Sequence, residues 1–350
     1  MSVSVRLLVF LALSVPALRA QEPAQPLTER QMDSITVVAG YQPGPGLWRV
    51  SKGENELWVL ATVSPLPKRM QWSADEVRQV IAESQEVIAP PNVKFEFDRG
   101  TFGMLMLLPS AMGARKNPDK ETLADQLPPE LYARWLLQKK RFMGRDRSVE
   151  KYRPIFAANE LFEAVLDELD LSTKPVVWPL VEKAVKKHKI PLTEPLVTLK
   201  IDDTKGKLKA FKEAELDDVA CLTNTLDLIE NELDVLKDRA NAWATGDVER
   251  LRSMSLIERA SACTNAMLNS AIGKDSGLDT LQQRVAESWL ASARTSLDKN
   301  RSTFAVLGLA QVLNEKQYLS ALRAEGYQVE APGESTEDTI PDSAPTAALE

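Results

Sequence analysis

The sequence predicts a mixed α/β (α+β) fold in which strands lie towards both ends of the chain and helices fill the middle. Residues 47–51 and 57–60 are apolar, β-forming runs on either side of a polar turn at residues 52–55, which is the pattern of a β-hairpin. Residues 208–271 have a helical pattern almost throughout. Residues 303–307 form a short apolar run of the kind that lies inside a sheet.

After the hairpin, the pattern predicts a helix and then a strand. Ser73 can cap a helix that ends near Ser84, with Glu76 completing a capping box. The apolar face of this helix consists of Val77, Val80 and Ile81. Residues 86–89 are typical of a short buried strand, which runs parallel to the strand at residues 57–60 if the helix is a crossover.

Residues 102–114 contain a long apolar run, for which a buried helix is the favoured interpretation. A cofactor pocket or a loop on a membrane surface has the same composition. Thirteen residues are too few to span a bilayer.

Further helices are expected at residues 129–142, 155–169 and 175–188, and a strand at residues 197–201. Leu131, Trp135 and Leu136 are expected on one face of the first of these helices. The densest basic patch of the chain consists of Lys139, Lys140, Arg141, Arg145, Arg147, Lys151 and Arg153. We interpret this patch as a solvated surface, with a docking face for an acidic partner or an anionic glycan as the alternative.

One long helix with a leucine stripe is predicted in the second half of the chain. Its apolar residues recur every three or four positions, at Leu222, Leu226, Ile229, Leu233 and Leu236. Gly246 ends this helical segment and Asp247 can cap the next one. Helices at residues 278–299 and 317–325 and a strand at residues 327–331 complete the fold.

The ends of the chain carry signs of export. Residues 1–20 have the form of a signal peptide, with Arg6 ahead of an apolar run and small residues before Gln21. Residues 21–37 are expected to be a flexible leader, residues 38–331 a single domain with a helical middle at about 120–300, and residues 332–350 a disordered acidic tail. We therefore expect a periplasmic or secreted protein with no membrane span in its mature form. With a net charge of −7, the chain lacks the excess of basic residues that is typical of nucleic-acid-binding proteins.

The chain has two cysteines, Cys221 and Cys263. Thiols tend to pair in the oxidising compartments that exported proteins reach. Each cysteine lies in a predicted helix, on either side of the break at Gly246, so a return of the chain can bring them together. We predict a disulfide between them, with two unpaired cysteines packed as small apolar residues in helix cores as the alternative.

The landmarks of the sequence are similar to those of a known family. Ala61-Thr62-Val63-Ser64 follows the hairpin, and Gly308-Leu309-Ala310-Gln311 follows the apolar run near the C-terminus. Together with Asn300-Arg301 and a Trp243-x-x-Gly246-Asp247 segment, this order resembles the TraB/GumN family, which is related to the Tiki proteases and to ChaN-like and erythromycin-esterase-like folds. The resemblance covers residues 38–331.

The resemblance implies that the N- and C-terminal strands share one central sheet, with the helical middle as a large insertion. In that family both four-residue motifs read Gly-x-x-His, whereas here Ala61 replaces the first glycine and Ser64 and Gln311 stand at the histidine positions. The chain therefore looks like a degenerate member. The resemblance also implies a cleft at the strand ends, with Thr62, Trp243, Gly246, Asp247, Asn300 and Arg301 as cleft or structural residues.

Few residues can carry chemistry at such a cleft. A catalytic zinc site normally needs three protein ligands, and the only histidine, His188, lies among lysines at a predicted helix end. We expect no metal and no cofactor, although a harder cation held by carboxylates is an open alternative. Ser64 as a nucleophile has no identifiable base in the sequence.

The sequence thus favours a non-catalytic protein over an enzyme. The leading hypothesis is an exported pseudoenzyme, related to metal-dependent hydrolases and proteases, that binds a peptide, protein or glycan of the cell envelope. The alternatives are a diverged hydrolase or metalloprotease with substituted ligands, and a helical module that binds other proteins through the basic patch.

Overall fold

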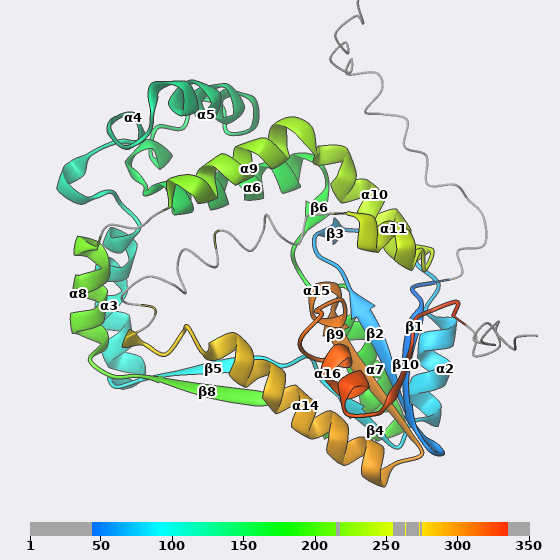
Figure 1. The fold of residues 1–350 in the computed structure, drawn as a ribbon. Coiled ribbons are helices and arrows are strands. Elements are labelled where there is room, and N and C mark those ends of the chain that lie inside the picture. The colour runs from blue at the N-terminus through cyan, green and yellow to red at the C-terminus, as the bar shows by residue number, and fades with distance from the viewer. Residues whose placement is uncertain (1–43, 215–217, 255–262, 264–272, 274, 335–350) are drawn as a thin grey trace, which may run out of the picture. The chain divides into compact units, whose positions relative to one another are not determined.

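The structure is a computed structural model that describes residues 44–214, 218–254, 263, 273 and 275–334 (Figure 1). The predicted signal peptide, the leader and most of the acidic tail lie outside the described residues. No helix within these ranges combines the length and the apolar character needed to cross a membrane.

A mixed six-stranded sheet forms the centre of the fold. Its strand order is β10-β1-β2-β9-β4-β7, and the bounds of the strands are β1 Leu47–Lys52, β2 Asn55–Thr62, β4 Glu86–Ile88, β7 Leu192–Thr193, β9 Ser302–Gly308 and β10 Gln328–Glu330. The predicted hairpin is confirmed, because β1 and β2 pair antiparallel. The C-terminal strand β9 lies between β2 and β4 and is parallel to both. The predicted sharing of one sheet by N- and C-terminal strands is therefore confirmed.

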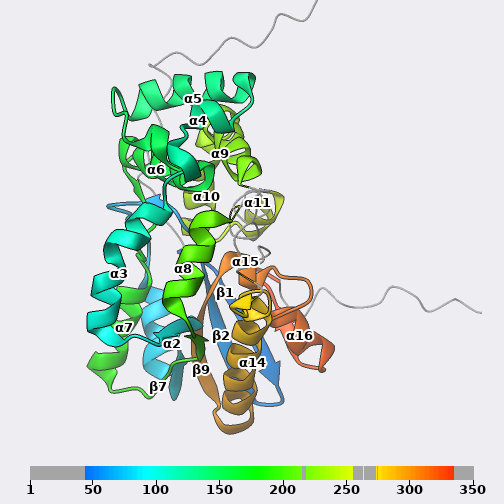
Figure 2. The ribbon, with the colours of Figure 1, turned by 90° about the vertical axis from the view of Figure 1, so that its left-hand side faces the viewer.

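Helices cover both faces of this sheet (Figure 2). Helix α2, Asp75–Glu83, packs with α7, Trp178–His188, on one face, while α14, Leu281–Lys299, contacts β2, β9 and β4 on the other. Two short helices, α15 at Leu309–Val312 and α16 at Leu319–Ala324, follow β9. The core between these layers is apolar, with Leu57, Val59, Phe304 and Trp289 among its fully buried side chains.

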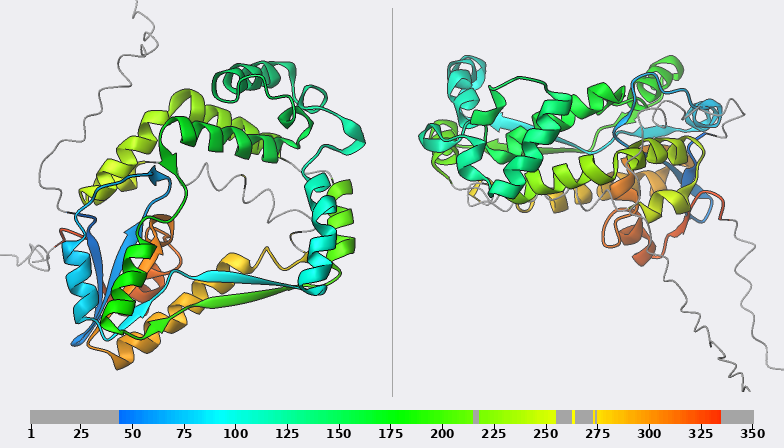
Figure 3. Two further views of the ribbon diagram at one scale, coloured as in Figure 1. Left: turned by 180° about the vertical axis from the view of Figure 1, so that it is seen from behind. Right: turned by 90° about the horizontal axis from the view of Figure 1, so that it is seen from above.

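The inserted part of the chain is mainly helical and has a hydrophobic core of its own around Trp135, Leu161 and Leu222. Two two-stranded sheets belong to it: β3 Leu66–Pro67 with β6 Leu171–Ser172, and β5 Asn92–Phe97 with β8 Leu196–Ile201, which run side by side in Figure 3. Its helices are α3 Gly100–Ala114, α4 Leu123–Gln126, α5 Pro129–Phe142, α6 Pro154–Glu168, α8 Thr204–Glu213, α9 Val219–Asn231, α10 Leu233–Ala244 and α11 Val248–Ser253, with 3-10 turns at Pro118–Lys120 and Val149–Lys151.

Two helix predictions were wrong in detail. The first concerned Ser73, since α2 begins one residue later, after Ala74, and no side-chain hydrogen bond caps it. The second concerned the leucine stripe, which continues over two helices, α9 and α10, because the backbone leaves the helical region at Glu232 (φ −136°). The predicted break at Gly246 is confirmed, and the Asp247 side chain accepts from the backbone N–H of Arg250.

Burial corrects three expectations. The apolar run at residues 102–114 was predicted to be buried, but it forms α3, whose side chains are largely exposed because α3 packs against α8 on one side only. Leu136 is exposed rather than on the buried face of α5. The basic patch is only partly solvated, since Lys139 is buried against Glu150 (Nζ–Oε1 2.9 Å) and the guanidinium of buried Arg153 donates to the backbone carbonyls of Phe211 and Ala214.

The predicted disulfide between Cys221 and Cys263 is confirmed, with the two Cα atoms 4.7 Å apart. Cys221 lies on the buried side of α9. The bond fixes residue 263 against the core of the helical insertion.

Candidate functional site

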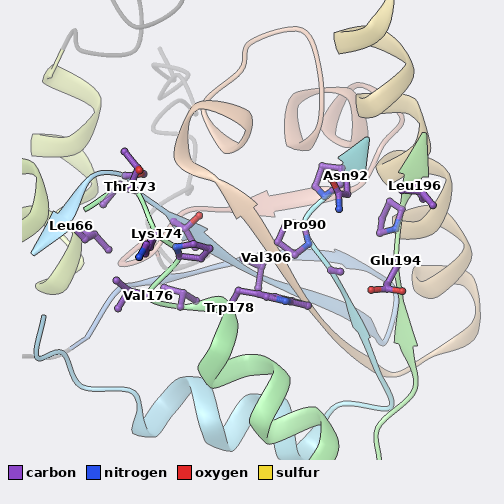
Figure 4. A pocket seen from close by; sticks show the side chains of 18 residues that line it. Leu66, Pro90, Asn92, Thr173, Lys174, Val176, Trp178, Glu194, Leu196 and Val306 are labelled. Atoms are coloured by element: carbon purple, nitrogen blue, oxygen red, sulfur yellow. The ribbon is translucent and has the colours of Figure 1, made fainter. Parts of the chain in front are cut away.

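A cavity of about 620 Å³ opens where the parallel strands of the central sheet end (Figure 4). Strands β2, β9, β4 and β7 run in the same direction, so their carboxyl ends meet at one edge. In open α/β sheets, ligands bind outside this edge. The cavity therefore lies where the fold class places a binding site.

Four chain segments form most of the cavity wall, and each carries a proline within three residues of the end of a strand. These prolines are Pro65 after β2, Pro90 after β4, Pro175 after β6 and Pro195 after β7. Proline has no N–H to donate to a sheet and has a fixed φ, so it ends a strand and stiffens the segment that follows. The wall is thus rigid before any ligand binds.

The cavity combines an apolar base with a polar rim. Trp178 and Val306 face each other at its base, and Leu66 lines one end (Figure 4). Lys174 and Glu194, both exposed, bring opposite charges from opposite sides. An aromatic surface beside separated charged and amide groups suits a ligand with apolar faces and several polar atoms, such as a peptide or a sugar.

The first motif, residues 61–64, lies at this cavity. Thr62 and Ser64 line it. The Thr62 hydroxyl donates to the carbonyl of Leu307 on β9 (3.1 Å), and the carbonyl of Ser64 accepts from the Arg239 guanidinium (3.1 Å). Burial lowers the pKa of Arg239. The Ser64 side chain itself is exposed to the cavity.

The second motif begins beside the first, because Gly308 is the register partner of Thr62 and Ala61 pairs with Leu307. Gln311, however, does not line the cavity. Its Oε1 accepts from the backbone N–H of Gly308 (2.9 Å), and its Nε2 donates to the Tyr318 hydroxyl (2.9 Å). Tyr318 is buried, and burial raises its pKa. Gln311 therefore closes the first turn of α15 and satisfies a buried phenol.

Trp243 and Gly246 attach the helical insertion to the chain at the central sheet, and Asp247 caps α11. The buried Trp243 indole donates to the carbonyl of Ala61 (2.7 Å), directly ahead of the cavity. Gly246 has φ +70°, and a Cβ there would lie 3.2 Å from the carbonyl oxygen of Gly44. Trp243 thus positions the end of β2, and none of the three residues lines the cavity.

Asn300 and Arg301 lie at the amino end of β9, away from the cavity edge. Arg301 is largely exposed and pairs with Glu54 on the hairpin turn (2.8 Å). Asn300 is buried and donates to Glu86 Oε2 (2.7 Å). The structure therefore separates this pair from the other cleft residues that we expected.

The comparison with protein families decides what kind of protein has this site. The sequence model of the TraB/PrgY/gumN family matches residues 46–331, well over half of the 350-residue chain. The chain belongs to the TraB/PrgY/gumN family. No curated protein sequence matches it.

The metal centre implied by our comparison with the TraB/GumN motifs does not fit the residues of this family member. Ser64 offers only a hydroxyl, and both ends of the Gln311 amide are already hydrogen-bonded. Neither side chain is a strong ligand for a transition metal. Within the described ranges, no three His, Cys, Asp or Glu residues lie together in a way that could hold a metal ion. His188 is exposed at the end of α7.

Three side chains of the cavity, Lys174, Trp178 and Glu194, were not predicted from the sequence. No motif marks them, because only the fold brings residues 174–178 and Glu194 to the same cavity as the ends of β2 and β4. The recurrence of a proline shortly after four separate strands is the signal that could have found them.

Proposed function

We propose that this TraB/PrgY/gumN-family protein is an exported, non-catalytic member that binds a peptide or glycan of the cell envelope in the cavity at the carboxyl ends of β2, β9 and β4. The observation that carries the proposal is the bonding of Gln311. We assign this residue to the position of the family's second histidine, where its amide acts as a structural link between Gly308 and Tyr318.

The composition of the cavity supports binding of an extended ligand. Trp178 provides a flat apolar surface, and Thr62, Asn92, Lys174 and Glu194 provide polar contacts at different places around it. Rigid, proline-rich walls reduce the entropy lost when a ligand is held. The disulfide supports export, since disulfides persist in oxidising compartments.

Restoring histidines tests the assignment of the motif. The wild-type protein and the double variant Ser64→His/Gln311→His are titrated with zinc and followed by calorimetry. We expect no stoichiometric zinc binding by the wild type and measurable binding by the double variant. Stoichiometric zinc binding by the wild type, or hydrolysis of envelope peptides by it, would favour the diverged hydrolase instead.

Binding is tested separately with soluble peptidoglycan fragments and envelope oligosaccharides. Lys174→Ala and Glu194→Ala remove exposed side chains at the cavity, so they leave the fold intact and are expected to weaken binding at least about tenfold, which corresponds to about 1.4 kcal/mol. Lys183→Ala, an exposed lysine on α7 outside the cavity, is the matched control. Equal affinities for all three variants would remove the cavity from the proposal.

A further inference from the structure

The cavity at the edge of the central sheet has a positive side and a negative side. Among the described residues that line it, Lys174 and Glu194 are the two that carry charge, and they lie on opposite sides (Figure 4). Neither forms an ion pair with a residue that the structure describes. The apolar side chains of Trp178 and Val306 lie between them in this view. A bound molecule would therefore meet a positive end, an apolar base and a negative end.

The positive end is formed where the small sheet of β3 and β6 ends. These strands pair antiparallel, so Ser64, which precedes β3, and Lys174, which follows β6, lie at the same end of the ladder. Thr173 also lines the cavity here, and all three side chains are exposed. An ammonium group and two hydroxyls are hydrogen-bond donors that suit a carboxylate.

The acidic residues closest to this small sheet lie at its other end and already have cationic partners. Lys68 follows β3 and Asp170 precedes β6, opposite the end that holds Lys174. Lys68 pairs with Asp167 (2.9 Å), and Arg69 lies 3.6 Å from Asp170. These carboxylates therefore do not neutralise the ammonium of Lys174 at the cavity.

A second cation lies behind the positive end. The half-buried Arg239 of α10 donates to the carbonyl of Ser64 (3.1 Å) and pairs with no carboxylate in the described ranges. The neighbouring Asp238 is bonded to Arg250 (3.0 Å). Arg239 does not line the cavity, so its charge adds to the positive potential there without contact to a ligand.

The negative end lies between β7 and β8, where Glu194 is exposed. The cations on the adjoining strands act on a different carboxylate. Lys94 pairs with Glu96 (2.9 Å), and this hydrogen bond and the charges of Lys94 and Lys200 hold the pKa of Glu96 below its ordinary value. Arg284 of α14 donates to a backbone carbonyl of β8 (3.0 Å). The Glu194 carboxylate is thus available to an ammonium group of a ligand.

We propose that the ligand of this cavity is a short peptide with both termini free, held with its C-terminal carboxylate at Lys174 and Ser64 and its N-terminal ammonium at Glu194. The inference rests on the proposed function, because it names the ligand class of the same cavity. Near neutral pH the α-carboxyl group of a peptide is ionised and its α-amino group is mostly protonated. Capture of a free terminus is a recurring mode of peptide recognition.

The size and the base of the cavity set the rest of the ligand. A volume of about 620 Å³ lies within the roughly 300–1,000 Å³ of sites for small ligands, so the peptide is only a few residues long. An apolar side chain in its middle would pack on Trp178.

A neutral oligosaccharide is a poorer occupant of the same cavity. Its rings could lie on Trp178, but it would cover Lys174 and Glu194 without pairing either charge. Charged groups that lose water without gaining a partner weaken binding. A peptide bound in the reverse direction would bring like charges together at both ends, which also opposes binding.

The test uses the full-length protein and three libraries of tetrapeptides whose two central residues vary among apolar and aromatic types. The first library has both termini free, the second has an amidated C-terminus and the third has an acetylated N-terminus. Bound peptides are measured by mass spectrometry after affinity selection. We expect the first library to be enriched at least about tenfold over each of the others, which corresponds to about 1.4 kcal/mol. The preference should decrease as salt is added.

Single variants identify which charge recognises which terminus. Lys174→Gln should remove the preference for a free carboxylate and keep the preference for a free amine, and Glu194→Gln should do the reverse. A purely structural role would lower the binding of all three libraries together. Lys183→Gln on α7 and Glu163→Gln on α6 change exposed residues outside the cavity, so these matched controls should select peptides as the wild type does.

The outcomes separate this inference from the proposed function. Equal enrichment of the three libraries, or enrichment of none, would overturn the inference. Binding of envelope oligosaccharides that still depends on Lys174 and Glu194 would then leave the proposed function standing, with a glycan as the ligand. If neither the peptides nor the envelope fragments bind, the proposed function fails as well.

Discussion

At the scale of single residues, Glu86 is the most constrained charge of the central sheet. Its carboxylate accepts hydrogen bonds from the hydroxyls of Thr193 and Ser296 (2.9 Å from Ser296) and from the Asn300 amide (2.7 Å). Burial on its own would raise the pKa of Glu86, but these hydrogen bonds and nearby Lys299 outweigh it and hold the pKa below its usual value. The folded protein therefore favours the ionised form.

This carboxylate predicts a pH dependence of stability. Because its pKa is lower in the folded protein than in the unfolded chain, its stabilising contribution is complete above about pH 4.3, the ordinary glutamate value, and is lost as the pH falls through the folded pKa. We expect Glu86→Gln to lower the free energy of unfolding at pH 7 by more than the ~0.5 kcal/mol typical of surface changes. The gap to the wild type should narrow below about pH 4.3.

Urea denaturation at a series of pH values measures this gap. Glu83→Gln, at the exposed end of α2, is the matched control and should leave the wild-type profile unchanged. A gap between the wild type and Glu86→Gln that stays constant from pH 7 to pH 3 would show that the ionised form is not favoured by folding.

Asn300 and Arg301 show why single residues are hard to assign from sequence. The two are adjacent in the chain. Asn300 is buried and donates to the Glu86 carboxylate, whereas Arg301 is exposed and pairs with Glu54 on the hairpin turn. Their roles depend on partners more than 200 residues away, at positions 86 and 54. A local sequence pattern contains no information about such distant partners. The cap at Asp247 could be predicted, because its partner is only three residues away.

At the scale of elements, the break between α10 and α11 depends on Gly246. It adopts φ +70°, which disfavours other residues, and a Cβ there would lie 3.2 Å from backbone atoms of Gly44 and Gly46. Gly53 has a similar φ of +65° but open space around it. Gly246→Ala should therefore lower the free energy of unfolding by about 1 kcal/mol or more beyond the effect of Gly53→Ala. The reason is that it adds a steric clash to the same backbone strain.

Thermal unfolding of the two glycine variants measures that difference. Equal losses of stability in the two variants would mean that the chain moves away from the added Cβ without a loss of stability. Only the φ angle would then matter at Gly246.

The disulfide is the second feature at this scale. Cys221 and Cys263 are 42 residues apart, so the bond should contribute about 4 kcal/mol in the chain-entropy model, less any strain in the native state. We expect the Cys221→Ser/Cys263→Ser variant to unfold at a markedly lower urea concentration. Reducing agent should destabilise the wild type and leave the variant unaffected. Two freely alkylated cysteines in protein taken from its native compartment would contradict both the bond and the argument for export.

Elements whose period and ends are set locally could be predicted from sequence. The hairpin, β9, α5 and α14 all have a clear apolar pattern between turn or capping residues. The exposure of α3 could not be predicted. The sequence of an apolar helix does not show whether neighbouring elements cover all of its sides or only one. Nor could the cavity, because its wall is assembled from four segments that meet only when β2, β9, β4 and β7 align.

At the scale of the whole molecule, β9 connects the two ends of the chain. It lies between β2 and β4, and Phe304, Ala305 and Leu307 within it are fully buried. Without β9, β2 and β4 would each lose a parallel neighbour and expose an unpaired edge. The helical insertion has a hydrophobic core of its own. It is attached to the sheet through Trp243, which donates to Ala61 on β2, the strand next to β9.

A chain that ends after Lys299 should therefore lose the cooperative unfolding transition of the central sheet. A chain that ends after Glu334 keeps every described strand and is the matched control, which should unfold as the full-length protein does. Near-UV circular dichroism and urea denaturation distinguish the two. Because six of the seven tryptophans, including Trp48, Trp58 and Trp289, lie in or against the core of this sheet, loss of its packing will change the near-UV signal directly. A cooperative transition in the shorter chain would show that the hairpin, β4 and the helices form a stable unit without β9, and that the C-terminal strand is an addition to the sheet rather than its centre.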